Sequence, residues 1–193
     1  MVDELKIFLF RHGESEFNRD KRFTGWLDSK LTPKGIQQAK IVAEKLRDKE
    51  FQVAYCTRLS RSKDTLTEVL KYHPNVKVIE DDRMIERSYG DFQGKTHKWC
   101  IEKFGKEQFD IYHRSYDVPP PSGESIKMVE GRVQNFIKDL LQKIKKEKIS
   151  VAISAHGNSM RPFRRHFEEF SIEEMMKLEN PWDNYFEYSI PLE

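Results

Sequence analysis

The chain has 193 residues, 37% of them hydrophobic and 34% charged, and its formal net charge is +2 at pH 7. This length suits one hydrophobic core, so we expect a single domain over residues 1–193. The small net charge disfavours nucleic acid as a partner, and the absence of any apolar run near the roughly 20 residues that span a bilayer excludes a membrane-spanning protein.

Predicted strands and helices alternate along the chain. The acidic residues 1–4 do not fit a signal or transit peptide and lead directly into an apolar strand from Leu5 to Phe10. Thr32 and Pro33 then begin a helix, as its N-cap and first helical residue. Apolar spacing and turn residues predict the other elements: strands at 51–56, 76–79, 149–154 and 185–190, helices at 60–72, 96–104 and 126–144, and two short helices after residue 157.

This order predicts an α/β fold with a doubly wound, mostly parallel sheet flanked by helices. Residues 83–94 show no regular period, and Arg87 and Arg114 are expected in irregular segments at the rim of a pocket. The two cysteines, Cys56 and Cys100, have neither a metal-binding nor a disulfide-framework spacing. We therefore expect buried or partly buried thiols, no metal and a cytoplasmic location.

Two predicted strands end in the same dipeptide, at His12-Gly13 and at His156-Gly157. A single histidine is usually structural or exposed. Parallel strands, however, place their carboxyl ends at one edge of the sheet, where open α/β sheets bind ligands. Each following glycine also lets backbone approach a ligand closely. The pair therefore predicts a pocket with two imidazoles.

Cations near these histidines indicate phosphate chemistry. Arg11 precedes His12, and Arg61 begins the helix after the second strand. Phosphoryl transfer spreads negative charge over three equatorial oxygens, which Arg11, Arg61 and a protonated His156 are suited to surround. A neutral His12 is suited to attack phosphorus and form a phosphohistidine. The sequence contains no P-loop, so side chains and backbone amides would have to hold the phosphate.

The leaving oxygen also needs a proton donor, and a carboxylate in the pocket is the natural candidate. Glu86 lies in the irregular stretch after the third strand. Glu14, Asp81 and Asp82 are alternatives that the residues alone leave open.

Five segments of the sequence resemble a known family and occur in that family's order: residues 11–18, 22–26, 86–90 with 93–94, 114–121 and 155–159. The first of these segments is typical of the histidine phosphatase superfamily. The second and the fourth are specific to the cofactor-dependent phosphoglycerate mutases within it, so the chain resembles this family.

The resemblance implies interconversion of 3-phosphoglycerate and 2-phosphoglycerate, a step of glycolysis and gluconeogenesis, with 2,3-bisphosphoglycerate as the primer. It implies His12 as nucleophile, Glu86 as acid/base, and Arg11, Arg61 and His156 as the phosphate pocket. A homodimer is compatible with it. The residues implied to contact substrate are Ser15, Asn18, Thr24, Gly25, Arg87, Tyr89, His97, His113, Arg114, Gly157 and Asn158.

The chain departs from the longer mutases in two substitutions, a missing insertion and a missing tail. His97, followed by Lys98, stands where those proteins have a lysine, and either residue is a candidate to bind the substrate carboxylate or phosphate. His113 replaces the first arginine of an Arg-Arg pair. The chain runs directly from Pro121 to Ser122 without the longer insertion. It also ends at Glu193 without the extended tail that covers the site. An uncovered phosphohistidine is open to water, so we expect a mutase with a raised bisphosphoglycerate phosphatase activity.

The sequence leaves two rival interpretations. One is a histidine phosphatase that hydrolyses 2,3-bisphosphoglycerate or another small phosphoester. The other is a catalytically silent module that binds phosphorylated ligands. The segments 24–26 and 114–117 favour the mutase because a general phosphatase needs no glycerate clamp, and the retained histidines and Glu86 disfavour the silent module.

Overall fold

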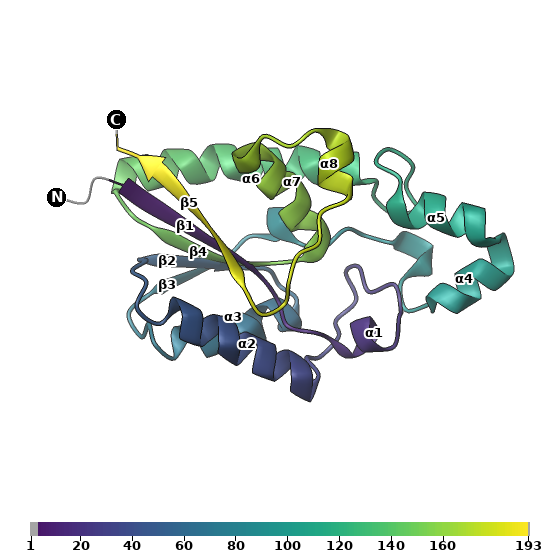
Figure 1. Cartoon of the computed structure of the whole chain (residues 1–193), viewed down its shortest axis with the longest axis horizontal. Helices are drawn as coiled ribbons and strands as arrows, with labels where there is room; N and C mark the ends of the chain where they lie inside the picture. Colours follow the sequence, from purple (N-terminus) through teal and green to yellow (C-terminus); the bar gives the residue numbers. More distant parts are fainter. Residues whose placement is uncertain (1–3, 193) are drawn as a thin grey trace.

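The computed structural model describes residues 4–192 and contains a five-stranded sheet in the order β3-β2-β4-β1-β5 (Figure 1). Neighbours from β3 to β1 pair in parallel, while β5 pairs with β1 in antiparallel fashion. The doubly wound, mostly parallel sheet is therefore confirmed, with one antiparallel edge. The strands are β1 (Glu4–Arg11), β2 (Val53–Cys56), β3 (Lys77–Glu80), β4 (Val151–Ala155) and β5 (Tyr185–Pro191).

Helices cover both faces of the sheet, as Figure 1 shows. On one face lie α2 (Pro33–Leu46) and α3 (Ser60–Leu70), and on the other α6 (Ile126–Glu147) and α7 (Gly157–Glu168). Side chains alternate along β1, so Phe8 and Phe10 pack with α2 and α3 while Ile7 and Leu9 pack with α6 and α7. Full burial of each such side chain contributes roughly 1.5–3 kcal/mol.

Shorter elements gather beyond the carboxyl ends of the parallel strands. They are α1 (Glu16–Arg19), α4 (His97–Phe104), α5 (Lys106–Arg114) and two single turns of 3₁₀ helix, Asp82–Met84 and Gly90–Phe92. Figure 1 shows α1, α4 and α5 on that side of the molecule. A separate cluster of buried side chains joins α4, α5 and the Gly90–Phe92 turn: Phe23, Tyr89, Phe92, Cys100 and Phe109. The last short helix, α8 (Ile172–Met176), follows α7.

The structure corrects one expectation about this region. Arg114 is the last residue of α5 and not part of an irregular segment. Gly105 ends α4 and also directly precedes α5 with a φ of 84°, so two helices follow each other across one glycine. Only Phe109 is buried in α5, and this weak apolar pattern gives no clear helical period in the sequence.

The strand register brings the two predicted histidines together. Arg11 pairs with Ala155, and the backbone amide of His12 donates to the Ala155 carbonyl over 3.0 Å. His12 and His156 thus follow adjacent strands at the same level of the sheet edge. Among residues 4–192, no helix is both long and apolar enough to cross a membrane.

Candidate active site

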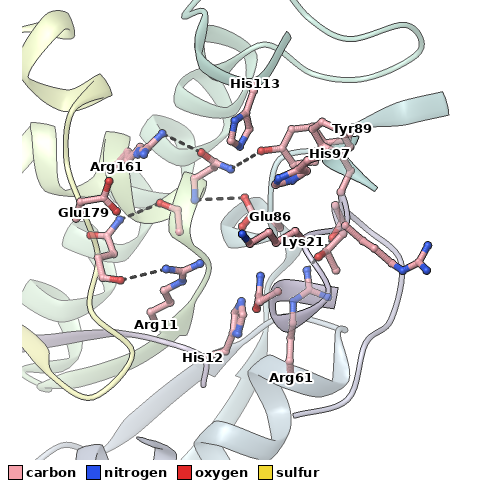
Figure 2. Close-up of a pocket in the computed structure, with 18 of the residues that line it drawn as sticks. Arg11, His12, Lys21, Arg61, Glu86, Tyr89, His97, His113, Arg161 and Glu179 are labelled. Atoms are coloured by element: carbon pink, nitrogen blue, oxygen red, sulfur yellow. Dashed lines mark hydrogen bonds between the residues drawn. The ribbon is translucent and has the colours of Figure 1, made fainter. Parts of the chain in front are cut away.

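A cavity of about 230 Å³ lies beyond the carboxyl ends of β1 and β4 (Figure 2). Six arginine and lysine side chains line it against two glutamates, so its lining carries a net charge of +4 with the histidines neutral. Such a lining favours a small polyanion. Most predicted site residues lie in its wall: Arg11, His12, Asn18, Thr24, Gly25, Arg61, Glu86, Tyr89, His97, His113, Arg114, Gly157 and Asn158.

His12 is fixed in one orientation at the base of the cavity. Its Nδ1 donates to the carbonyl oxygen of Gly13 over 2.7 Å, which leaves the lone pair on Nε2. Burial, together with the charges of Arg61 and Arg11, lowers the pKa of His12 well below its ordinary value. A Cβ on Gly13 would lie 2.1 Å from the carbonyl oxygen of Gly35, so glycine is required there. The geometry thus presents an unprotonated imidazole nitrogen.

His156 lies behind the wall, with its ring centroid 5.0 Å from that of His12. A hydrogen bond of 2.8 Å joins its Nε2 to the hydroxyl of Thr57. Its Nδ1 is buried and has no hydrogen-bond partner among the described residues. We expected a protonated His156, but burial, Arg61 and His12 lower its pKa well below the ordinary value. The free site therefore holds His156 neutral.

Two further predicted contacts are absent from the cavity wall. Ser15 caps α1, and its hydroxyl bonds to Oδ1 of Asn18 over 2.9 Å, so it orients Asn18. The guanidinium of Arg87 donates to the carbonyls of Tyr112, His113 and Glu124. Arg87 therefore joins the end of α5 to the segment that carries Glu86. Both residues position their neighbours and have no side-chain surface in the cavity.

Backbone carbonyls hold the two phosphate-binding candidates Arg11 and Arg61. Arg61 is 1% exposed and donates to the carbonyls of Gly25, over 2.7 Å, and Leu27, over 2.9 Å. Burial lowers the pKa of Arg61 to about 10, so it remains charged at neutral pH. Arg11 donates from Nη1 to the Asn180 carbonyl over 3.1 Å, while its Nε is buried without a partner in the described residues (Figure 2). Carbonyl partners thus leave both cations unneutralised.

Of the carboxylates considered from the sequence, only Glu86 lines the cavity. Its Oε1 accepts from the backbone amides of Arg87, over 2.7 Å, and Asn158, over 3.2 Å. Its own carbonyl accepts from Trp26 and Arg132, which fixes the backbone at this point. The alternatives are engaged elsewhere: Glu14 with Thr32, Asp81 with Arg83 and Asp82 with Arg58.

The far wall carries the two substitutions noted in the sequence. His97 on α4 and His113 and Arg114 on α5 line the cavity. The Lys98 side chain, in contrast, is 83% exposed and pairs with Glu102. His97, and not Lys98, therefore faces the cavity. Burial lowers the pKa of both histidines, and that of His113 falls to about 3.

Sequence reasoning missed several residues of the wall. Arg161 is one turn after Asn158 on α7, and this helical spacing from the His-Gly motif was a usable indication. Its Nη1 donates to Asn158 Oδ1 over 3.2 Å (Figure 2). Arg22 and Phe23 begin the matching segment 22–26, although they were not named as contacts. No motif marks the others, which lie before α4 and between α8 and β5: Lys21, Leu178, Glu179 and Asn180.

Comparison with known proteins agrees with this geometry. The family model for the histidine phosphatase superfamily (branch 1) matches residues 7–187. The chain is 40% identical to the 2,3-bisphosphoglycerate-dependent phosphoglycerate mutase of Parvibaculum lavamentivorans, over 89% of this chain and 84% of that protein. It is 37% identical to the phosphoglycerate mutase of Schizosaccharomyces pombe, over 90% and 84%.

A solved structure, the alpha-ribazole phosphatase from Shigella flexneri, superposes with a TM-score of 0.84. At 22% identity over 95% of this chain and 89% of that one, this likeness concerns the fold alone. The more specific family assignment rests on the relatives found by sequence. The chain belongs to the histidine phosphatase superfamily, and within it to the family of the 2,3-bisphosphoglycerate-dependent phosphoglycerate mutases.

Proposed function

We propose that this protein interconverts 3-phosphoglycerate and 2-phosphoglycerate through a phosphohistidine at His12. The observation that carries the proposal is the hydrogen bond from Nδ1 of His12 to the Gly13 carbonyl. It fixes the tautomer in which Nε2 is the nucleophile, and the low pKa of the buried ring keeps that nitrogen unprotonated at neutral pH. Relatives of this chain that are 37–40% identical bear the mutase name.

Two unpartnered buried nitrogens support a phosphate site beside His12. They are Nε of Arg11 and Nδ1 of His156. A buried donor without a partner is costly, and a phosphate oxygen would satisfy it. In the tautomer in which Thr57 donates to Nε2 of His156, Nδ1 carries a proton and serves as such a donor. With Arg61, these groups surround the equatorial oxygens of a transferring phosphoryl group.

The same features fit 2,3-bisphosphoglycerate, because a cavity with a net charge of +4 suits a ligand with two phosphates and a carboxylate. When bound, this primer supplies the phosphoryl group that loads His12. Arg11, Arg61 and His156 would hold one phosphate, and Arg114 and Arg22 on the opposite wall are placed to hold the remaining anionic groups.

Glu86 is the proposed acid/base. It takes the proton from the substrate hydroxyl that attacks the phosphohistidine, and it returns a proton to the ester oxygen that leaves when His12 is phosphorylated again. The two backbone amides on Oε1 hold the carboxylate toward the cavity. His97 and His113, held neutral, contribute hydrogen bonds without a fixed charge.

A coupled assay with 3-phosphoglycerate, run with and without 2,3-bisphosphoglycerate, tests the proposal. We expect 2-phosphoglycerate formation that depends strongly on the bisphosphate, and an acid-labile, alkali-stable phosphoryl group on His12 after brief incubation with it. Formation of 2-phosphoglycerate at an unchanged rate in the complete absence of the primer, or no phosphoryl group on His12, would contradict it.

A histidine phosphatase is the second candidate function, and the same nucleophile serves it. One observation favours it: the Glu179 side chain in the cavity wall is exposed, so solvent reaches the site from this side. Water that reaches the phosphohistidine would take the place of the glycerate hydroxyl. Phosphate release measured beside 2-phosphoglycerate formation separates the two: a mutase makes 2-phosphoglycerate faster than phosphate.

A further inference from the structure

The segment between α8 and β5, residues Leu178–Trp182, lies against the cavity and binds two of its arginines. We call it the strap. Its Leu178 carbonyl accepts from Nε and Nη2 of Arg161, over 3.2 and 3.1 Å. Its Asn180 carbonyl accepts from Nη1 of Arg11 (Figure 2). The strap therefore contacts the cations of the site through backbone that carries no charge of its own.

The strap is itself fixed to α7. The side chain of Asn180, which is 6% exposed, donates to the Gly157 carbonyl over 3.0 Å and accepts from Arg164 over 3.0 Å. Arg164 also pairs with Glu168 one turn later in the same helix. An element with these anchors has a defined position, so groups that it presents to the cavity are held precisely.

The strap contacts Arg11 through the side chain of Trp182 as well as through backbone. Cζ of Arg11 lies 4.6 Å from the centroid of the Trp182 ring, a distance at which a guanidinium stacks favourably on an indole. Gly157 lies against the same guanidinium, since a Cβ built there would be 3.4 Å from both Cζ and Nη2. With Nη1 bonded to Asn180, the Nε–Nη2 edge has no hydrogen-bond partner in the described residues.

These contacts leave one edge of the guanidinium free, and it is an edge that binds two oxygens of one phosphate. An arginine side chain that is free to rotate would lose much of that geometry. We propose that Trp182 is a positioning residue for the phosphate reaction, which acts by holding the Nε–Nη2 edge of Arg11 toward the phosphate. This inference rests on the phosphate role proposed for Arg11.

The indole N–H of Trp182 is buried and has no partner in the described residues, so it is not the group that holds Arg11. The face of the indole ring holds Arg11, so two substitutions of Trp182 should have different effects. Trp182→Phe keeps an aromatic face and removes an unpaired N–H, whereas Trp182→Ala removes the face. We expect kcat/KM to fall roughly tenfold in Trp182→Ala and by less than about threefold in Trp182→Phe.

The decisive test is a double-mutant cycle between Trp182→Ala and Arg11→Lys, read as inhibition by orthovanadate and by inorganic phosphate. Orthovanadate adopts the five-coordinate geometry of the transferring phosphoryl group, so it should lose affinity more than phosphate does when Arg11 is misaligned. If Trp182 acts through Arg11, its removal should have little further effect in Arg11→Lys. Tyr72→Ala is the matched control. Cζ of Arg47 lies 5.2 Å from the centroid of the Tyr72 ring, so the substitution removes the same kind of contact outside the cavity.

Equal losses for both anions in Trp182→Ala, or a full additional loss in the Arg11→Lys background, would overturn the inference. So would a thermal unfolding temperature that falls as far in Trp182→Phe as in Trp182→Ala, with the same loss of activity. Inhibition by orthovanadate or phosphate can be measured whether the enzyme forms 2-phosphoglycerate or releases phosphate. The cycle therefore still reports on Trp182 if the wild type hydrolyses phosphoesters instead of isomerising phosphoglycerate.

Discussion

The ring centroids of His97 and His113 lie 5.1 Å apart, and both rings pack against Phe23. Burial of this pair keeps it uncharged, because adding a proton would place a cation in an apolar contact beside Arg114. Two residues of the cavity wall thus carry no charge at neutral pH and become cationic only in acid. Their titration affects the stability of the fold as well as the site.

The first prediction follows from the pKa of His113, which burial lowers from 6.5 to about 3. Between these values the unfolded chain binds a proton that the folded chain does not, so stability is lost as the pH falls from about 6.5 toward 3. In His113→Gln the slope of the free energy of unfolding against pH should decrease by up to about 1.4 kcal/mol per pH unit. Urea titrations at pH 4.5 to 7 measure it. An unchanged slope, or the same change in the exposed-site control His166→Gln, would contradict the prediction.

The second prediction concerns the nucleophile. His12→Ala should lower turnover by at least about 10⁴-fold, because no other described side chain in the cavity presents an unprotonated imidazole fixed at the strand end. Inorganic phosphate should still bind, since Arg11 and Arg61 remain. Rapid-quench measurement and calorimetry give the two quantities. His166→Ala, at an exposed site on α7, is the control. Full activity of His12→Ala would rule out His12 as the nucleophile of either a mutase or a phosphatase.

The third prediction concerns Glu179, whose negative charge opposes anions that enter the cavity. Glu179→Gln should tighten binding of 2,3-bisphosphoglycerate by about twofold to fivefold, and that of inorganic phosphate by less, because the Coulomb energy grows with ligand charge. The difference should shrink at high salt. Inhibition constants at two ionic strengths test this. Glu173→Gln, which removes a surface ion pair with Lys177, should change neither constant. Equal gains for both anions would count against an electrostatic role.

The fourth prediction compares two glycines. Gly25 has a φ of +54°, a Cβ there would lie 2.2 Å from Oε1 of Gln93, and its carbonyl binds Arg61. Gly25→Ala should therefore cost more than about 1 kcal/mol of stability and weaken phosphate binding. Gly131 lies inside α6 with open space around it, so Gly131→Ala should stabilise the fold by roughly 0.5–1 kcal/mol without changing activity. Thermal unfolding distinguishes them, and a stable, fully active Gly25→Ala would refute the first part.

Most of the sheet and its flanking helices could be predicted because each has a regular apolar pattern and clear ends. Thr32 caps α2 by accepting a hydrogen bond from the Gly35 amide. The long helix α6 buries the apolar residues of one face, of which Ile126 is the first and Ile144 the last. The helix α5 could not be predicted, because Phe109 is its only buried residue and one residue gives no helical period. Local patterns therefore sufficed wherever an element packs on the sheet.

The site divides in the same way. His12 and Arg61 follow a strand or begin a helix, so topology alone places them at one sheet edge. Glu86 was one of four candidate carboxylates on the residues alone, and the family resemblance selected it. Trp182 contacts Arg11, and Glu179 lines the cavity, because the chain returns from α8 to the antiparallel edge strand β5, a path that no short motif encodes. Ser15 and Arg87 were expected to touch substrate, and their hydrogen bonds to neighbours could be seen only in three dimensions.

The contact between Gly13 and Gly35 has a consequence for how a phosphate could move between two carbons. Because neither residue has room for a Cβ, the loop behind the nucleophile rests directly on the first turn of α2. The imidazole is thereby tied to a helix and cannot follow a departing ligand. For C2 and C3 of the glycerate to meet the same nitrogen in turn, it is the small molecule that has to rotate while the protein stays still.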